Sequence, residues 1–341
     1  MTGGQSVLSQ VLGGIAAFAQ HQWIERRHSQ ERLTRLRVPV EWVVDASEPR
    51  IRLIGNYVEK LADAVETALR YSDELLRCMP PPVTLAGRVW AIDPQVNAFF
   101  ATANDLREAL DQPAIRSFFQ GGARECFALM LMVRRETESF GMGLRGDVLV
   151  REVRQTLVNF SRHQLFFPST SEDGLRRELR QRTVVFLATR ALERIGELRT
   201  RRGDLEEQRR RLQAQLRALR GHSQGLRPLL SSPDDIADER RAAALEQRLV
   251  QTEEELVAAR KQLGTLDDYL EQVRQVLSQP EPYLQVRPLN LRLNRMGVKL
   301  DPNASEPGEN LTLIELESMG ERRIGALVRF AREELPPDAT G

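Results

Sequence analysis

The residues whose spacing is most typical of chemistry are three glycines in the segment FGMGLRGDVLV, at Gly141, Gly143 and Gly146. Glycines at this GxGxxG spacing bind the pyrophosphate of a dinucleotide when the first follows a buried strand and the third opens a helix. Here the preceding residues are RRETES, and no alternation of strands and helices follows. We therefore expect a loop between two helices at this place, and no cofactor.

A second arrangement places His21, Glu25 and His28 on one helical face, at i, i+4 and i+7. Three such side chains bind zinc only when they line a catalytic pocket, and structural zinc takes four ligands. Because arginines surround them, we expect a solvated face and no metal site. The tripeptide RGD occurs at 145–147 and 202–204, which chance explains in an Arg-rich chain.

Composition narrows the function classes. The chain has 341 residues, 41% hydrophobic and 28% charged, which indicates a folded protein with a sizeable core. A net charge of +1 gives no global attraction to nucleic acid or anionic lipid. Cys78 and Cys126 are most simply free thiols of a reducing compartment, and a disulfide between them is the alternative. These features favour a cytoplasmic protein.

The most apolar segment near the N-terminus is VLSQVLGGIAAFA, at residues 7–19. A secretory signal would have a Lys or Arg before this segment, and none precedes it. The segment is also shorter than the roughly 20 residues of a membrane span. Its apolar positions recur with a helical period, which predicts an amphipathic helix docked on the protein. The alternative is a helix on a membrane surface whose arginines face anionic lipid: Arg26, Arg27, Arg32, Arg35 and Arg37.

The predicted fold is mainly α, in three domains, of which the first is a helical domain over residues 1–168. Its expected helices cover 1–36 and 50–78, with several more between 102 and 164. The triple proline at 80–82 ends the second of these helices. Two segments are left open: 38–49 as a short strand or an extended linker, and 83–100 as a hairpin or loop.

The second domain, residues 169–279, is predicted to be a long antiparallel coiled-coil hairpin with helices at about 171–220 and 233–278. A capping box at Ser169–Glu172 opens the first helix. Ser232 followed by Pro233 opens the second. Apolar residues in both helices alternate at spacings of four and three, as in a coiled coil. At 1.5 Å per residue, the paired part gives an arm of roughly 50 Å.

The apolar residues at these spacings form a line along each helix, its seam. The seam and the distribution of charge explain why the first helix is rich in arginine. Residues 198–220 carry eight Arg and three acids, whereas 234–271 carry eleven acids and five Arg or Lys. Opposite charges on the flanks of two helices favour their pairing with each other. The register that best fits the seam places Arg202 beside Ala259 and Arg209 beside Thr252, because a long aliphatic stem needs a small neighbour. We therefore expect these arginines to face an acidic helix of the same chain rather than nucleic acid.

The third domain, residues 280–341, is predicted to be a small β-rich module with a flexible tail. In RPLNLRLN (287–294), leucines alternate with polar residues, which is typical of a half-buried strand. The segments 311–317 and 323–332 flank a glycine-containing turn and resemble a hairpin. The second of these segments is left open between strand and helix.

The function favoured by this pattern is non-catalytic, because no serine, cysteine or carboxylate pair lies in a recognisable catalytic context. We expect a cytoplasmic scaffold or adaptor that binds another protein, or itself, through its coiled-coil arm and flanking domains. It is predicted to have no cofactor, no metal and no nucleic-acid partner. The alternatives are a peripheral membrane-associated component and an enzyme with an unrecognised site in the N-terminal domain.

Overall fold

The computed structural model describes residues 27, 30–145, 148–223, 234–301, 303 and 306–336. The chain forms two compact units. Unit 1 combines residues 1–66 with 185–278, and unit 2 combines residues 67–184 with 279–341. The helices α2 (Tyr57–Arg77) and α6 (Glu172–Ser223) contribute residues to both units.

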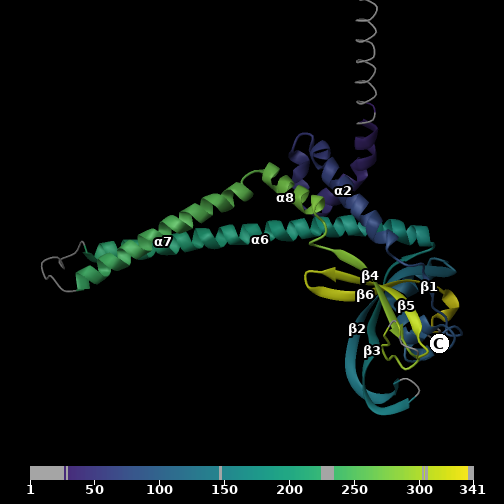
Figure 1. Cartoon of the computed structure of the whole chain (residues 1–341). Helices are drawn as coiled ribbons and strands as arrows, with labels where there is room; N and C mark the ends of the chain where they lie inside the picture. Colours follow the sequence, from purple (N-terminus) through teal and green to yellow (C-terminus); the bar gives the residue numbers. More distant parts are fainter. Residues whose placement is uncertain are drawn as a thin grey trace, which may run out of the picture. The chain divides into compact units, whose positions relative to one another are not determined.

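Unit 2 contains a six-stranded sheet (Figure 1). Its order is β3-β2-β6-β5-β4, all antiparallel neighbours, and β1 pairs with β6 in parallel. The strands are β1 (Val83–Thr84), β2 (Glu125–Arg145), β3 (Val148–Ser169), β4 (Gln285–Leu293), β5 (Glu309–Ser318) and β6 (Glu321–Ala331).

This sheet shows that the predicted mainly α fold with a small C-terminal β module is wrong. Strands from 125–169 pair with strands from 285–331 in one sheet, so the C-terminal strands do not form a module of their own. The segment 102–164, predicted as helices, contains only α4 (Ala103–Leu110) and α5 (Pro113–Gln120) before the long hairpin of β2 and β3 begins.

The reason for this error is visible in β2. Side chains of one face lie in a core with the short helices: Cys126, Ala128, Met130 and Met132. Side chains of the other face, Phe127, Leu129 and Leu131, pack in a second core. A strand buried on both faces has a continuous apolar run without alternation, and periodicity alone cannot distinguish such a run from a buried helix.

The two faces of the sheet are covered by different helices. One face packs on α3 (Pro94–Phe99), α4 and α5, whose buried residues include Phe99, Leu106 and Ile115. The other packs on Leu75 and Leu76 at the end of α2, and on Leu175 and Leu179 at the start of α6. The segment 83–100, left open by the sequence, therefore contains the short strand β1 and helix α3, which Asp93 caps through hydrogen bonds from Gln95 N and Val96 N.

The three strands expected in the C-terminal region are present. Residues 323–332, left open between strand and helix, lie largely in β6. Met319 and Gly320 form the two-residue turn from β5 to β6 with φ angles of 52° and 81°. Positive φ at both central residues fits the hairpin turns whose twist matches the flanking strands.

In its first described segment, unit 1 contains a helix over residues 30–46, followed by η1 (Pro49–Leu53) and the first part of α2. The segment 38–49, predicted as a strand or linker, is therefore helical up to residue 46. Leu36, Val40, Val43 and Val44 are all buried, and their spacing is that of one helical face. The β-branched residues favoured a strand, but burial along this face stabilises the helix.

The rest of unit 1 consists of the later part of α6, α7 (Asp234–Gln262) and α8 (Leu266–Ser278). The sequence predicted one helix from 233 to 278, and this helix is interrupted at 263–265. The Asp268 carboxylate accepts hydrogen bonds from Gly264 N (3.0 Å) and Thr265 N (2.7 Å). Thr265 and Asp268 have the spacing of a capping box, so a new helix starts there.

Candidate interaction surface on the helix pair

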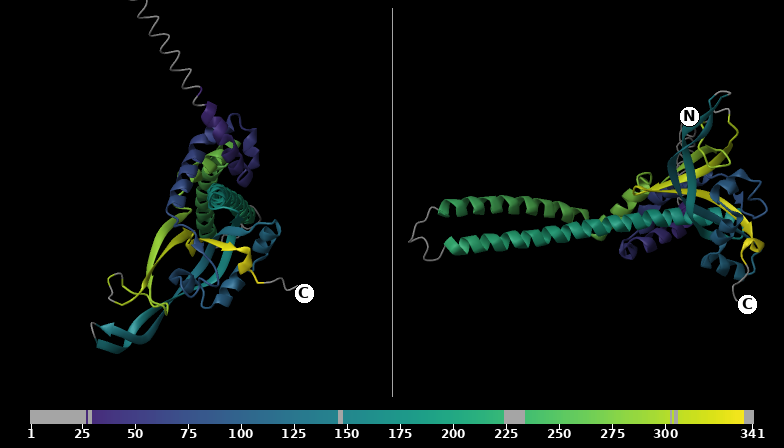
Figure 2. Two further views of the ribbon diagram at one scale, coloured as in Figure 1. Left: turned by 90° about the vertical axis from the view of Figure 1, so that its right-hand side faces the viewer. Right: turned by 90° about the horizontal axis from the view of Figure 1, so that it is seen from below.

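The later part of α6 and α7 lie side by side and run in opposite directions (Figures 1 and 2). Leu205, Leu256 and Ala259 form a hydrophobic cluster between the two helices. Thr252 is also buried, and its hydroxyl donates to the carbonyl oxygen of Arg248 on its own helix at 2.8 Å. The cluster agrees with the predicted register, in which Leu205 lies opposite Leu256.

Ion pairs on the flanks agree with this register. They join Arg201 to Glu255 (3.9 Å), Arg220 to Glu246 (2.6 Å) and Arg260 to Glu206 (3.3 Å). Each pair joins equivalent flanking positions of two antiparallel seams, which is where coiled-coil helices place their interhelical charges. All these groups are substantially exposed except Glu206, so each pair adds only about 0.2–1 kcal/mol and acts mainly on partner choice.

Among the described side chains, the prediction that the arginines of 198–220 face an acidic helix holds for Arg201 and Arg220. Arg202 and Arg211 instead pair with acids one turn along α6. Arg199 reaches Glu48, before η1. Arg209 lies in the seam, and its Nε atom is buried without a hydrogen-bond partner in the described part of the chain.

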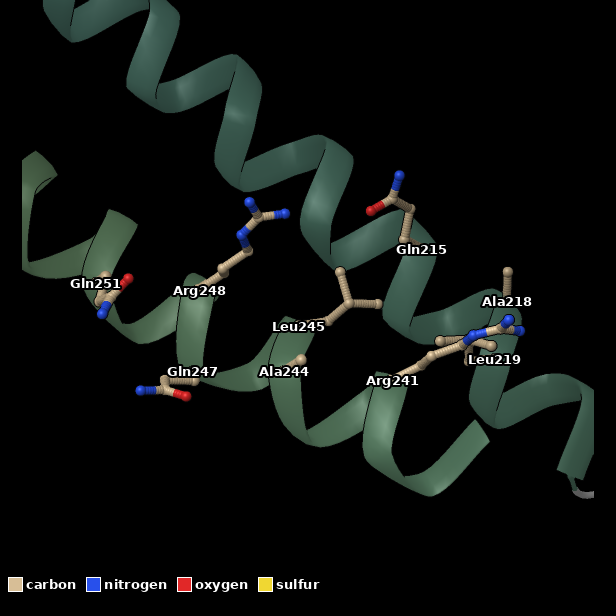
Figure 3. Close-up of a pocket in the computed structure, with 9 residues that line it drawn as sticks. All are labelled: Gln215, Ala218, Leu219, Arg241, Ala244, Leu245, Gln247, Arg248 and Gln251. Carbon is tan, nitrogen blue, oxygen red and sulfur yellow. The ribbon is translucent and has the colours of Figure 1, made fainter. Parts of the chain in front are cut away.

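Toward the loop between α6 and α7, the seam is less closely packed. Leu205, Leu212 and Leu216 are buried, whereas Leu219 and Leu245 are only half-buried. There a groove of about 720 Å³ runs between the helices. Its lining combines apolar side chains with neutral and basic ones (Figure 3): Gln215, Ala218, Leu219, Arg241, Ala244, Leu245, Gln247, Arg248 and Gln251.

The figure shows how these side chains are arranged. Leu245 and Arg248 of α7 point toward α6, and the Arg241 side chain lies beside Leu219 (Figure 3). Ala218 and Ala244 are exposed. The groove thus offers apolar surface with arginine and glutamine at its rim, and none of the described residues that line it is acidic. Such a surface can bury an apolar face of a partner and attract acidic flanks.

A second polar cluster lies in unit 1 around the buried carboxylate of Glu48. Arg50 donates to both of its oxygens, at 2.8 and 3.0 Å, and Arg199 of α6 donates to one at 2.7 Å. The hydrogen bonds from Arg50 lower the pKa of Glu48 most, burial opposes them, and Arg199 adds to the lowering, which brings the pKa to about 2. This cluster ties the segment before η1 to α6.

We expect Glu48→Gln to lower the free energy of unfolding by about 1–3 kcal/mol, because it removes the charged acceptor of both arginines. The folded-state pKa lies below the ordinary value of 4.5. The contribution of Glu48 is therefore fully present above pH 4.5 and is lost as the pH falls toward 2. Urea unfolding between pH 2.5 and 7 measures this, and Glu48→Gln should lose less stability than the wild type across that window. An equal loss of stability in the wild type and in Glu48→Gln would mean that the Glu48 carboxylate does not stabilise the fold through Arg50 and Arg199.

The other residues singled out by the sequence lie elsewhere. Gly141 and Gly143 are in β2 and pair with Val153 and Val150, so the expected loop between helices is wrong. Gly146 lies outside the described residues, as do His21, Glu25 and His28. Cys78 is exposed, Cys126 is buried, and neither forms a disulfide, as the simpler interpretation predicted.

The arginines of the membrane alternative are partly engaged within unit 1. Arg32 pairs with Asp63 at 2.7 Å and with Glu66 at 2.5 Å, and Arg35 pairs with Glu66 at 3.1 Å. Arg37 is exposed, whereas Arg26 and the segment 7–24 lie outside the described residues. In the part of the chain that is described, no helix combines the length and apolarity needed to cross a membrane.

Sequence reasoning missed both the groove and the Glu48 cluster. The apolar positions of the seam continue at the same spacing to Leu219 and Leu245, so the sequence gives no sign that the pair loosens toward the loop. Glu48 and Arg199 are distant in the sequence, and no local motif connects them. The chain matches no known protein family, no curated protein and no solved structure.

Proposed function

We propose that this chain is a non-catalytic scaffold or adaptor of the cytoplasm, which binds another protein or a second copy of itself through the α6–α7 pair. The observation that supports this most is the groove near the loop, where Leu219 and Leu245 remain half-buried between the helices. Two unpaired cysteines agree with a reducing compartment.

The outer surface of α7 supports the same proposal. Val250 and Val257, seven residues apart, are 54% and 55% exposed. Residues at this spacing lie on one helical face. Covering apolar surface contributes about 25 cal/mol per Å². A partner helix that covers the groove would gain affinity by covering Leu219 and Leu245. The arginines at the rim would favour a partner with acidic side chains.

The proposal assigns the arginines of α6 to the protein itself rather than to nucleic acid. Five of the eight between 198 and 220 form ion pairs with carboxylates in the chain: Arg199, Arg201, Arg202, Arg211 and Arg220. Carboxylates of the chain thus balance part of the positive charge of this stretch, which would otherwise attract the phosphates of a nucleic acid along its whole length. This distribution supports an interaction surface for protein, with α6 and α7 as its framework.

The test compares two pairs of substitutions on the same helices. Ala218→Glu with Ala244→Glu places two carboxylates in the groove. The control, Ala214→Glu with Ala243→Glu, changes exposed alanines that do not line it. Tagged full-length chains are captured from the native cells, bound proteins are quantified by mass spectrometry, and self-association is measured by sedimentation.

We expect the wild type and the control to retain a common partner, or to self-associate, and the groove variant to lose that interaction at least tenfold. Circular dichroism should show equal helix content in all three proteins. Identical partners and identical sedimentation in the wild type and the groove variant would overturn the proposal.

A further inference from the structure

A hollow distinct from the groove lies in unit 1, where η1, α6 and α8 meet. Its volume is about 450 Å³. Arg50 comes from η1, and Tyr269 comes from the first turn of α8. The remaining lining residues, Arg199, Arg202, Gly203 and Glu206, come from one stretch of α6. We propose that this hollow binds a phosphate group.

The first support is that two guanidinium groups are held in position. Glu48 accepts from Arg50 and Arg199 together, and both guanidinium groups lie over the Tyr269 ring, at 5.7 and 5.0 Å from its centre. Two like charges would otherwise separate. Because the buried carboxylate and the ring fix them, little side-chain entropy remains to be lost when an anion binds.

The second support is the number of donors left over. A guanidinium group has five N–H donors. Arg50 and Arg199 each use Nε and one Nη in the hydrogen bonds to Glu48 and Tyr269, and among the described residues Arg202 donates from its Nε to Glu206. All three side chains are between 41% and 57% exposed, so a ligand can reach the remaining donors.

The third support is the balance of charge. Glu206 is the acidic residue of the lining, and one of its oxygens is shared by Arg202 and Arg260, each at 3.3 Å. Four guanidinium groups thus face two carboxylates, Glu48 and Glu206, which leaves a surplus of two positive charges. A phosphate monoester carries up to two negative charges, and its planar O–P–O edges match the guanidinium fork.

Gly203 supplies the space. A β-carbon built at this position would meet nothing within 4 Å, so this side of the hollow is open. The volume admits a phosphate together with part of the group that carries it. A soluble phosphomonoester and a phosphorylated lipid headgroup share this chemistry, and the experiment must separate them.

The test titrates the full-length chain with inorganic phosphate in a calorimeter and measures sedimentation with phosphatidylcholine vesicles, with and without phosphatidylinositol phosphate. Arg202→Gln removes a donor of the hollow without touching Glu48. Arg211→Gln is the matched control, since Arg211 is on the same helix, pairs with Glu207 and does not line the hollow. Arg202→Lys keeps the positive charge but removes the planar guanidinium group, which can donate two parallel hydrogen bonds to a phosphate.

We expect binding in at least one arm, weakened about tenfold or more by Arg202→Gln, partly restored by Arg202→Lys and unchanged by Arg211→Gln. Binding of inorganic phosphate indicates a general phosphate site, and binding of the phosphorylated vesicles alone indicates a headgroup. The proposal is overturned if neither probe binds with a Kd near or below about 1 mM, or if Arg202→Gln binds as tightly as the wild type. Equal thermal melting of all four proteins shows that folding is not the cause.

Discussion

Replacing Leu291 with Asp is expected to lower the free energy of unfolding of unit 2 by about 3–5 kcal/mol, because it places an unpaired charge in the main core. Leu291 is 4% exposed and packs with Leu311 and Leu313 of β5 and with Ile324 of β6. Leu293, at 3% exposure, should respond similarly. Leu289 is half-buried at the edge of the same core and should respond less.

The control is Asn290→Asp, in the same strand. Asn290 is exposed on the opposite face, so its replacement should change stability by no more than about 0.5 kcal/mol. Urea denaturation followed by tryptophan fluorescence gives the comparison, because Trp90 packs against this core. If Asn290→Asp destabilises the protein as much as Leu291→Asp does, β4 does not have the assigned faces.

The second large effect concerns the helix pair. Leu256→Asp should separate α7 from α6, because Leu256 is 2% exposed and lies in the cluster with Leu205 and Ala259. We expect a loss of several kcal/mol in the local stability of the pair. Val257→Asp is the matched control, since Val257 is the next residue on α7 and is 55% exposed.

Hydrogen exchange measured by mass spectrometry resolves this local effect. Peptides from α7 and from residues 201–219 of α6 should lose protection in Leu256→Asp, while peptides from β2 and β6 keep theirs. Val257→Asp should resemble the wild type. Equal protection of α7 in both variants would mean that the seam does not hold the two helices together.

The sequence predicted local elements better than their assembly. The 3-4 spacing of leucines located α6 and α7 and set their register, since each heptad adds another apolar contact that a different alignment would lose. The alternation in 287–294 predicted β4 because one side of that strand is buried and the other exposed. Both signals depend on a clear boundary between core and solvent.

Where that boundary is absent, the prediction failed. Residues 126–132 of β2 are packed on both faces, so they show neither the two-residue nor the helical period. Val40, Val43 and Val44 favour a strand by their β-branched side chains, although their spacing is that of a buried helical face. The break at 263–265 is hidden by the apolar seam, which continues through it, and its only signal in the sequence is the local pair Thr265 and Asp268.

The candidate surfaces were less predictable than the fold. The groove depends on how far Leu219 and Leu245 are left uncovered, which the heptad pattern does not encode. The hollow beside Tyr269 depends on three segments that meet only after folding. The sequence did identify α6 as unusually rich in arginine, and it predicted that the chain itself supplies acidic partners.

Disulfide cross-linking is the most direct test of whether α7 packs against α6 with Leu256 opposite Leu205. Leu205→Cys is combined with Leu256→Cys, Leu249→Cys or Leu263→Cys in a chain with Cys78→Ser. Cys126 can remain, because burial raises the pKa of its thiol to about 12 and keeps it protonated. Residues 249 and 263 lie one heptad from 256, roughly 10 Å along α7, beyond the Cα separation of a disulfide.

We expect rapid cross-linking within one chain for 205 with 256, and little for 205 with 249 or 263 under the same mild oxidation. Non-reducing electrophoresis and peptide mapping by mass spectrometry identify the linked pair. Faster cross-linking to 249 or 263, or cross-links that form only between two chains, would contradict the pairing of α6 with α7 on which the proposed interaction surface depends.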